Sequence, residues 1–326
     1  MKTKLILLAC VAVLGFLGVC QGLLTKNFYK NSCPSAESTV NQIISQRVLT
    51  NPSLPARLLR MHFHDCFVRG CDGSILLNST ANSIAEKDAL INLNLASFDV
   101  IDEIKAALET ACPRTVSCSD ILALAARDAV SFQYNRNLWV VLTGRRDGTV
   151  SLASEPPLNL PTPDMNFTRL KQNFANKGLS QQDLIVLSGG HTIGIGHCFL
   201  FRSRLYNFTG NGDQDPSLDP TYATFLKTQC PNDNTDFVSS VEMDPASSTN
   251  VDTNYYSNLL QKKGLFSSDA ALLTNNDARN AVIQLVKIDR FLNAFANSME
   301  RMGAIGVLTG TAGQIREKCW LVNSST

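Results

Sequence analysis

Residues 58–67 have the sequence LLRMHFHDCF and contain two of the four histidines of the chain, His62 and His64. The segment follows Pro55 and has helical spacing, so Arg60 and His64 are expected to project from one face of a helix. A fixed positive charge and a titratable base on that face can act together on one small molecule. An isolated pair of this kind is more simply explained as a surface arginine and a core histidine. Only the neighbouring sequence can favour a functional interpretation of the pair.

Helical periodicity continues on both sides of this stretch. Apolar residues recur at helical spacing in residues 98–111 and 120–132. Ser180 and Asp183 are placed as in a capping box, which predicts a short helix that ends at Gly189 and Gly190. A longer amphipathic helix is expected over residues 277–302, where it ends before Gly303. The predicted fold class is mainly α with little β structure.

A third histidine follows two glycines in LSGGHTIG, residues 187–194. Glycines allow a backbone or a flat ligand to approach closely, and they place His191 at the predicted end of a helix. Phe291 and Phe295, farther along the chain, form a helical aromatic stripe that is better explained as core than as a contact to a cofactor. The glycine and histidine motif by itself does not identify a function.

Together, RxxFHDC at residues 60–66 and GGHT at residues 189–192 resemble the distal and proximal motifs of class III plant secretory haem peroxidases. The resemblance extends over nearly the whole chain: FYxxSCP at 28–34, GCDGS at 70–74, EKD at 86–88, SCxD at 117–120, GRRD at 144–147 and RLY at 204–206. It implies a haem peroxidase fold with one haem b between distal and proximal helical halves. It also implies that hydrogen peroxide is reduced while phenolic or other small donors are oxidised in one-electron steps.

On the distal side, the resemblance implies that His64 accepts a proton from hydrogen peroxide and returns it to the outer oxygen. Arg60 would stabilise the negative charge on that departing oxygen. Asn92 matches the residue that fixes the His64 tautomer, and Glu86 matches the residue that connects this network to a metal site. Phe63 lies beside the pair in the same motif.

On the proximal side, the resemblance implies that His191 is the axial ligand of the haem iron and that Asp269 accepts a hydrogen bond from its other ring nitrogen. Pro161 matches a proline that lines the aromatic-donor site. The surrounding positions vary within the family, so the preferred donor stays open; they are Leu90, Thr162, Asp164 and Leu200.

Two calcium ions are also expected. Oxygen-bearing residues follow His64 at alternate positions, a spacing that suits a hard cation such as calcium but also an aspartate-capped turn. The first set contains Asp65, Val68, Gly70, Asp72 and Ser74, with Val68 and Gly70 contributing carbonyls. The second set matches the family's proximal site and contains Thr192, Asp244, Ser247, Asn250 and Asp252. Residues 244–252 differ in detail from the commonest form of that loop, so the calcium affinity stays open.

The N-terminus has the pattern of a signal peptide: basic residues, an apolar run from Leu5 to Val19 and then small residues. The run is shorter than the roughly 20 apolar residues of a spanning helix, and cleavage is expected after Cys20 or Gly22. Residues 23–326 would then form a single domain, because the Pro-rich stretch 155–163 suits a loop. Sequons at Asn78, Asn166, Asn207 and Asn323 agree with secretion and glycosylation.

Eight cysteines remain after the predicted cleavage, an even number that implies four disulfides in a secreted protein. Spacing alone leaves their pairing open. The family resemblance implies the pairs Cys33–Cys112, Cys66–Cys71, Cys118–Cys319 and Cys198–Cys230.

The net charge of +1 comes from dispersed charges, which argues against a nucleic acid or membrane partner. We therefore expect a small-molecule partner. The signal-peptide pattern and the family resemblance imply a secreted monomer in the extracellular space or cell wall, with roles such as wall polymerisation, peroxide removal or stress response. Two other classes of protein fit the sequence less well. A zinc hydrolase could use His62 and His64, but imidazoles two residues apart on a helix diverge. A binding or wall-structural protein would not need Arg60, His64 and His191 together.

Overall fold

The computed structural model describes residues 24–324. Helices dominate this part of the chain, and its two strands form one short antiparallel sheet, so the mainly-α prediction is confirmed. The predicted signal peptide and both cleavage points lie outside the described residues.

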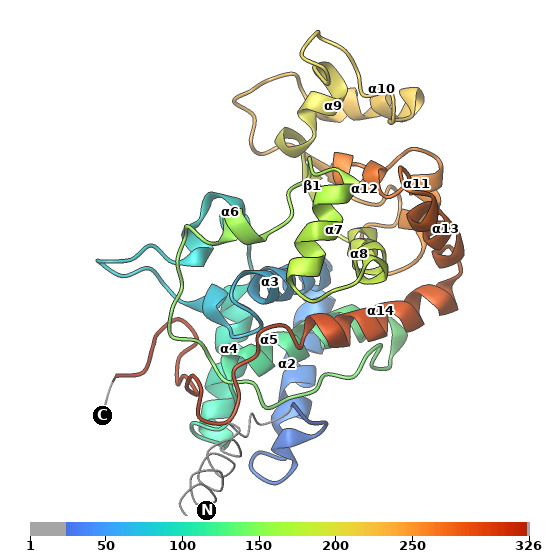
Figure 1. The fold of residues 1–326 in the computed structure, drawn as a ribbon. Coiled ribbons are helices and arrows are strands. Elements are labelled where there is room, and N and C mark those ends of the chain that lie inside the picture. The colour runs from blue at the N-terminus through green and yellow to red at the C-terminus, as the bar shows by residue number, and fades with distance from the viewer. Residues whose placement is uncertain (1–23, 325–326) are drawn as a thin grey trace, which may run out of the picture.

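Four helices from the first part of the chain form one group, in which three pack against the fourth (Figure 1). They are α2 (Ala36–Thr50), α3 (Leu54–Val68), α4 (Phe98–Ala111) and α5 (Cys118–Ser131). Every residue of α5 is buried, and the helix packs against α2, α3 and α4. A helix that is enclosed on all sides fixes its neighbours. α3, which carries LLRMHFHDCF, is therefore held on a rigid support.

A second group of helices packs around α8 (Gln181–Leu187). Its members are α7 (Phe167–Asn176), α13 (Asn276–Leu285) and α14 (Ile288–Met302), with α11 (Asn254–Leu260) against α13. The predicted capping box is present, because Ser180 accepts a hydrogen bond from the Asp183 backbone while the Asp183 side chain bonds to the Ser180 backbone. The 3₁₀ turn η6 (Ser188–Thr192) continues directly from α8 and carries His191.

A smaller lobe lies at the top of Figure 1 and has its own hydrophobic cluster. It contains α9 (Arg202–Tyr206), α10 (Pro220–Gln229) and the sheet of β1 (Ile195–His197) with β2 (Ser240–Glu242). The strands pair antiparallel with Gly196 opposite Val241. The remaining short elements are α6 (Pro156–Asn159), α12 (Ser267–Ala271), η1 (Phe28–Lys30), η2 (Ser74–Leu76), η3 (Glu86–Asp88), η4 (Leu90–Asn92), η5 (Phe132–Tyr134) and η7 (Cys198–Leu200).

Two helix predictions need correction. The expected single helix over residues 277–302 is two helices, because Lys287 has an extended backbone between α13 and α14. Apolar neighbours on both sides of Lys287 preserve the helical pattern in the sequence, and so the pattern does not reveal the break. The glycines after α8 also do not end the helical path; it tightens into η6 and continues through His191 to Thr192.

The disulfides of the structure have the four expected pairings. Cys118–Cys319 joins residues 201 positions apart and attaches the C-terminal segment to the start of α5. Cys66–Cys71 closes a short loop after α3, and Cys198–Cys230 closes the upper lobe. Each bond restricts the unfolded chain and so favours the folded state.

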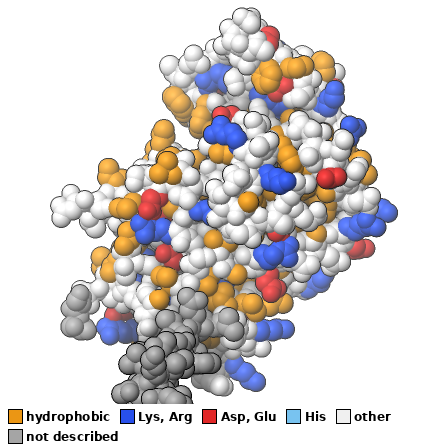
Figure 2. Space-filling view, viewed as in Figure 1, with side chains coloured by type: hydrophobic (Ala, Val, Ile, Leu, Met, Phe, Trp, Pro, Cys, Tyr) orange, Lys and Arg blue, Asp and Glu red, His pale blue; other side chains and the backbone are white. Residues whose placement is uncertain are grey.

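On the face shown in Figure 2, basic and acidic side chains are interspersed without a large patch of one sign. Among residues 24–324, no helix combines the length and the apolar character that a membrane crossing requires.

The carboxylate of Asp120, at the start of α5, joins three segments of the chain. It accepts hydrogen bonds from the Tyr29 hydroxyl at 2.7 Å, the Gly144 amide at 2.7 Å and Arg145 Nη1 at 2.7 Å. Asp120 and Arg145 are both buried, so each charge depends on the other for compensation. Arg47 and Glu103 form a comparable pair that is exposed to solvent.

We predict that Asp120→Asn lowers the free energy of unfolding by about 3–5 kcal/mol, because it leaves the buried Arg145 charge without its partner. Glu103→Gln is the matched control and should cost no more than about 1 kcal/mol, since solvent screens the exposed pair. Urea unfolding of both variants measures the difference. Equal losses in the two variants would contradict the importance of the buried pair.

Candidate active site

Helix α3 presents Arg60, Phe63 and His64 on adjoining parts of its surface. His64 is buried, Arg60 is half-buried, and the Phe63 ring stands edge-on to the His64 ring at 5.6 Å. Arg60 Nη2 donates to the Ile91 carbonyl at 3.3 Å, which draws the guanidinium toward the η4 turn. The expected convergence of the cation and the base on one side of α3 is therefore compatible with the helix geometry.

The orientation of the His64 ring is determined by Asn92. His64 Nδ1 lies 2.7 Å from Asn92 Oδ1, and Asn92 Nδ2 donates to the Glu86 carbonyl at 2.8 Å. Because the amide oxygen can only accept, His64 Nδ1 carries the hydrogen and its Nε2 is the basic nitrogen. The backbone of η3 thus fixes the amide, and the amide fixes the tautomer of the histidine.

Electrostatics keep His64 neutral and Arg60 charged. Burial, followed by the nearby Arg60 charge, holds the pKa of His64 well below its usual value. Burial lowers the pKa of Arg60 to about 10, which still leaves the guanidinium protonated near neutral pH. A neutral imidazole beside a permanent cation can accept a proton while the cation stabilises a neighbouring negative charge.

His191 is held in a similar manner from the other half of the molecule. Its Nδ1 lies 2.8 Å from Asp269 Oδ1, and the Asp269 carboxylate also accepts from the Phe266 amide at 2.8 Å and the Tyr255 hydroxyl at 2.9 Å. Burial would raise the pKa of Asp269, but His191 and these hydrogen bonds lower it below its usual value. The carboxylate is therefore a charged acceptor, and the Nε2 of His191 is left as a lone-pair donor.

Packing brings η6 against α3. A side chain at Gly190 would contact Leu59 of α3 at 3.5 Å, so the turn that carries His191 lies next to the helix that carries His64. At Gly189 a Cβ would lie 2.4 Å from the Tyr256 hydroxyl, which explains the need for glycine there. The His191 side chain is 39% exposed, whereas Asp269 is buried behind it. A half-open imidazole supported by a buried carboxylate is the donor arrangement that suits an iron ligand.

Comparison with known proteins identifies the family of this chain. A family profile described as peroxidase matches residues 37–287. Peroxidase 3 of Arabidopsis thaliana is 51% identical over 315 residues, which are 96% of each chain. Peroxidase 24 of the same plant is 52% identical over 308 residues, 93% of this chain and 88% of the relative. The chain belongs to the class III plant peroxidases.

Membership in this family makes the protein a haem-dependent enzyme that uses hydrogen peroxide to oxidise reducing donors. Haem and calcium are bound by peroxidases of this family in general. The imidazole of His191, supported by Asp269, fits a ligand of haem iron. Two clusters of oxygen atoms, one after His64 and one after His191 in the chain, are the candidates for binding calcium.

The first oxygen group begins in the last turn of α3 and continues into the loop after it. Asp65 and Asp72 are buried, and burial followed by their mutual repulsion raises the pKa of Asp65 well above its usual value. Ser74 Oγ and both carboxylate oxygens of Glu86 are buried without a hydrogen-bond partner of normal length among residues 24–324. The Val68 carbonyl, another expected ligand, accepts from Lys177 Nζ at 3.2 Å. Buried carboxylates and unpartnered oxygens together fit a hard cation.

The second oxygen group surrounds Thr192, directly after His191. Thr192 Oγ1 lies 3.3 Å from Asp244 Oδ2, 3.3 Å from the Asn250 carbonyl and 3.2 Å from Asp252 Oδ1. One hydroxyl hydrogen cannot satisfy three acceptors, and burial together with the Asp252 charge raises the pKa of Asp244 to about 7. Ser247 also bonds to Asp252. The set expected from the sequence therefore converges in a form that fits calcium.

Each expected ligand set contains only two side chains of the His, Cys, Asp and Glu types, Asp65 with Asp72 and Asp244 with Asp252. In the described part of the chain no cluster of three such side chains has the geometry of a metal site. The two oxygen groups differ from that type, because most of their donors are hydroxyls and backbone carbonyls. Sequence reasoning missed Tyr255, which donates to Asp269, and Asn258, which donates to Asp244 at 2.7 Å. A pair of tyrosines at 255–256 was the available signal for the first.

The other predicted residues lie at different places. His62 is buried, lines a small cavity beside Arg145, and lies with Nδ1 3.7 Å from Cys66 Sγ. Burial, followed by the Arg145 charge, lowers its pKa to about 3. The zinc interpretation requires His62 and His64 to act together, and the two side chains do not pair. Pro161 is half-buried. Asn78, Asn166 and Asn207 are exposed, whereas Asn323 is half-buried and its Nδ2 donates to the Ile315 carbonyl.

We predict that chelation lowers the melting temperature and the turnover of this peroxidase, and that calcium restores both. A cation that binds only the folded state stabilises it by about 2.7 kcal/mol at about a hundred times its Kd. Thermal melting with measured calcium content tests this, and Asp72→Asn should reduce the calcium-dependent shift, while Asp277→Asn at the surface should not. An unchanged melting temperature after verified calcium removal would refute the prediction.

Proposed function

We propose that this peroxidase binds one haem between α3 and η6, with His191 as the iron ligand and His64 and Arg60 on the opposite side. The observation that carries the proposal is that both histidines are held at Nδ1, by Asn92 at 2.7 Å and by Asp269 at 2.8 Å. Each ring therefore directs Nε2 away from its support. One such nitrogen is suited to proton transfer and the other to ligation.

His64 acts as the proton acceptor for hydrogen peroxide. Its Nε2 is neutral because burial keeps its pKa low, and Asn92 holds the hydrogen on Nδ1. Arg60 stabilises the charge that develops on the outer peroxide oxygen, and His64 then returns the proton to that oxygen. Phe63, beside the His64 ring, limits the access of water to this transfer.

His191 and Asp269 act as one unit on the other side. The buried carboxylate strengthens the imidazole as an electron donor to a metal, and the Phe266 amide and Tyr255 hydroxyl keep the carboxylate in place. When bound, haem supplies the iron and the porphyrin that accept and transfer the oxidising equivalents. The protein supplies ligation, orientation and proton transfer.

In this proposal two calcium ions stabilise the site. The first is held by Asp65, Val68, Gly70, Asp72 and Ser74, with Glu86 behind it, and the second by Thr192, Asp244, Ser247, Asn250 and Asp252. The first set begins directly after His64 and the second directly after His191. Each cation neutralises buried carboxylates that would otherwise repel one another, so its loss would disturb the adjacent histidine.

Reducing donors, phenols among them, approach near Pro161. We further propose that residues 23–326 work as a single secreted domain, a monomer in the extracellular space or cell wall that binds neither nucleic acid nor membrane. The leader-like N-terminus, four disulfides and exposed sequons support export. The interspersed surface charges support a small-molecule partner.

We predict that His64→Ala retains haem but reacts with peroxide about 10²–10⁴-fold more slowly, because the proton acceptor is lost. Stopped-flow absorbance of the haem after mixing with peroxide measures the rate. His197→Ala is the control, since that histidine stacks on Phe199 in the upper lobe. A near-normal rate in His64→Ala would remove His64 from the role.

We also predict that Asp269→Asn keeps haem and raises the reduction potential of its iron. A neutral amide leaves the imidazole of His191 less basic, so less electron density reaches the metal and the ferric state is less stabilised. Spectroelectrochemical titration measures the potential, with the exposed Asp289→Asn as control. An unchanged or lower potential in Asp269→Asn would exclude Asp269 from this function.

A further inference from the structure

A continuous series of aromatic rings begins at His191. The Tyr255 ring lies 5.8 Å from the His191 ring, and Tyr256 lies 5.1 Å from Tyr255. Phe291 of α14 lies 5.4 Å from Tyr256, and Phe295, one helical turn later, lies 5.3 Å from Phe291. All four aromatic residues are buried.

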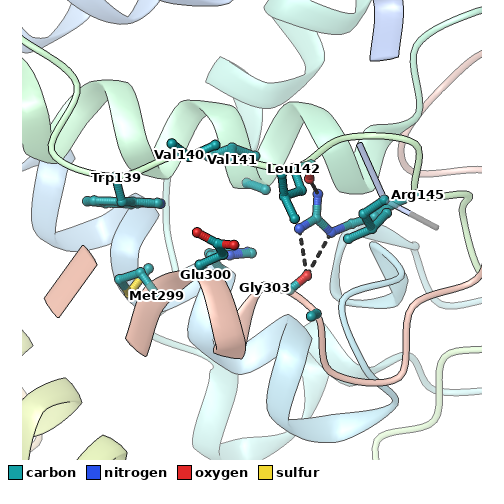
Figure 3. Close-up of a pocket in the computed structure, with 12 residues that line it drawn as sticks. Trp139, Val140, Val141, Leu142, Arg145, Met299, Glu300 and Gly303 are labelled. Atoms are coloured by element: carbon teal, nitrogen blue, oxygen red, sulfur yellow. Dashed lines mark hydrogen bonds between the residues drawn. The ribbon is translucent and has the colours of Figure 1, made fainter. Parts of the chain in front are cut away.

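The series ends at Trp139, whose ring stands 5.9 Å from that of Phe295. Trp139 and Met299 line a cavity of about 10 Å³, room for about one water molecule. Figure 3 shows both side chains at one end of this cavity and Arg145, bonded to the Gly303 carbonyl, at the other. The neighbouring Val140 is 40% exposed, so the series extends from His191 nearly to the surface.

Tyrosine and tryptophan are the aromatic side chains that lose an electron most readily, and tyrosine does so when its phenolic proton has an acceptor. Tyr255 has one, because its hydroxyl donates to Asp269 Oδ1 at 2.9 Å. The Tyr256 hydroxyl donates only to backbone carbonyls, Ile185 and Val186 at 3.1 Å each. Tyr255 is therefore the residue beside His191 that is prepared for oxidation.

A second aromatic contact of His191 leads elsewhere. Phe266 lies 5.5 Å from the His191 ring and Phe201 lies 6.3 Å from Phe266. Phenylalanine is too difficult to oxidise to carry a radical, and within residues 24–324 no tyrosine or tryptophan ring pairs with Phe266 or Phe201. The branch through Tyr255 is the one that connects oxidisable residues, with Phe291 and Phe295 as packed bridges between Tyr256 and Trp139.

We propose that this series is an exit path by which oxidising equivalents leave the haem for Trp139 when no donor is present, with Tyr255 as the first residue oxidised. The proposal rests on the proposed function, because the oxidant is the haem that His191 would hold, after its reaction with hydrogen peroxide. The path protects His191 and the porphyrin from oxidation, because it moves the oxidising equivalent to Trp139.

Tyr255 gives one electron to the oxidised haem group and its phenolic proton to Asp269, which breaks the O–H bond and leaves a tyrosyl radical. One electron then passes from Trp139 through Phe295, Phe291 and Tyr256 to Tyr255, and Asp269 returns the proton. The result is intact Tyr255 and an indole radical cation on Trp139, which an external reductant restores.

Excess hydrogen peroxide added to the haem-loaded protein without a donor tests the path. Peptide mass spectrometry then compares oxidation of Trp139, which is 5% exposed, with oxidation of the more exposed Trp320, the other tryptophan of the chain. We expect Trp139 to be oxidised several-fold more, and a phenolic donor to suppress the difference. Rapid-freeze electron paramagnetic resonance should detect a tyrosyl signal that Tyr255→Phe removes.

Two variants interrupt the path at different points. Tyr255→Phe and Phe295→Leu should each reduce Trp139 oxidation several-fold, whereas Tyr134→Phe, which loses a hydroxyl bonded to the Val251 carbonyl, should not. The Phe291 ring packs against Gly189 in the turn that carries His191, whereas Phe295 lies one step farther along the series, beside Trp139. Phe295→Leu therefore separates the path from the ligand support. In protein that turns over donors normally, equal oxidation of both tryptophans, or Trp139 oxidation unchanged by Phe295→Leu, would overturn the path alone. Haem-loaded protein without any turnover would overturn the proposed function and the path together.

Discussion

The hydrogen bond between His191 and the buried Asp269 carboxylate is the interaction on which the arrangement of the second half depends. A buried charge requires partners, and the Asp269 oxygens obtain them from His191, the Phe266 amide and the Tyr255 hydroxyl. These groups come from η6, the start of α12 and α11. One carboxylate thus fixes three short elements whose own lengths would not make them rigid, and it determines where the ring nitrogen of His191 is presented.

The same principle operates on the distal side with a neutral group. Asn92 uses its amide nitrogen on the Glu86 carbonyl and its oxygen on His64, so the histidine is oriented without receiving a negative charge. This difference matters chemically. An imidazole supported by a carboxylate becomes a stronger donor to a metal, whereas one supported by an amide and buried beside Arg60 remains neutral and can accept a proton. Two histidines in one protein therefore acquire different chemistry from their partners.

Buried carboxylates near both histidines connect the site to the stability of the fold. Burial raises the pKa of Asp65 and of Asp244, and the neighbouring charge, Asp72 in the first case and Asp252 in the second, raises it further. Hydrophobic packing around α5 and α8 holds these groups together against their repulsion. A cation in each place would relieve that repulsion, so the cost of assembling the site and the benefit of binding a metal are linked.

The sequence by itself determined the helical class, the capping box at Ser180, the helix over residues 98–111 and the candidate residues of the site, because each depends on local spacing or on motifs that are contiguous in the chain. It could not reveal the break at Lys287, since the apolar pattern continues through it, or the passage of α8 into η6 through two glycines. The tertiary structure alone decided that Tyr255 supports Asp269, that Asn258 supports Asp244, and that rings from α11, α14 and Trp139 form one series. Those contacts join residues that are distant in sequence, and they are selected by the packing of whole helices, to which no local pattern is sensitive.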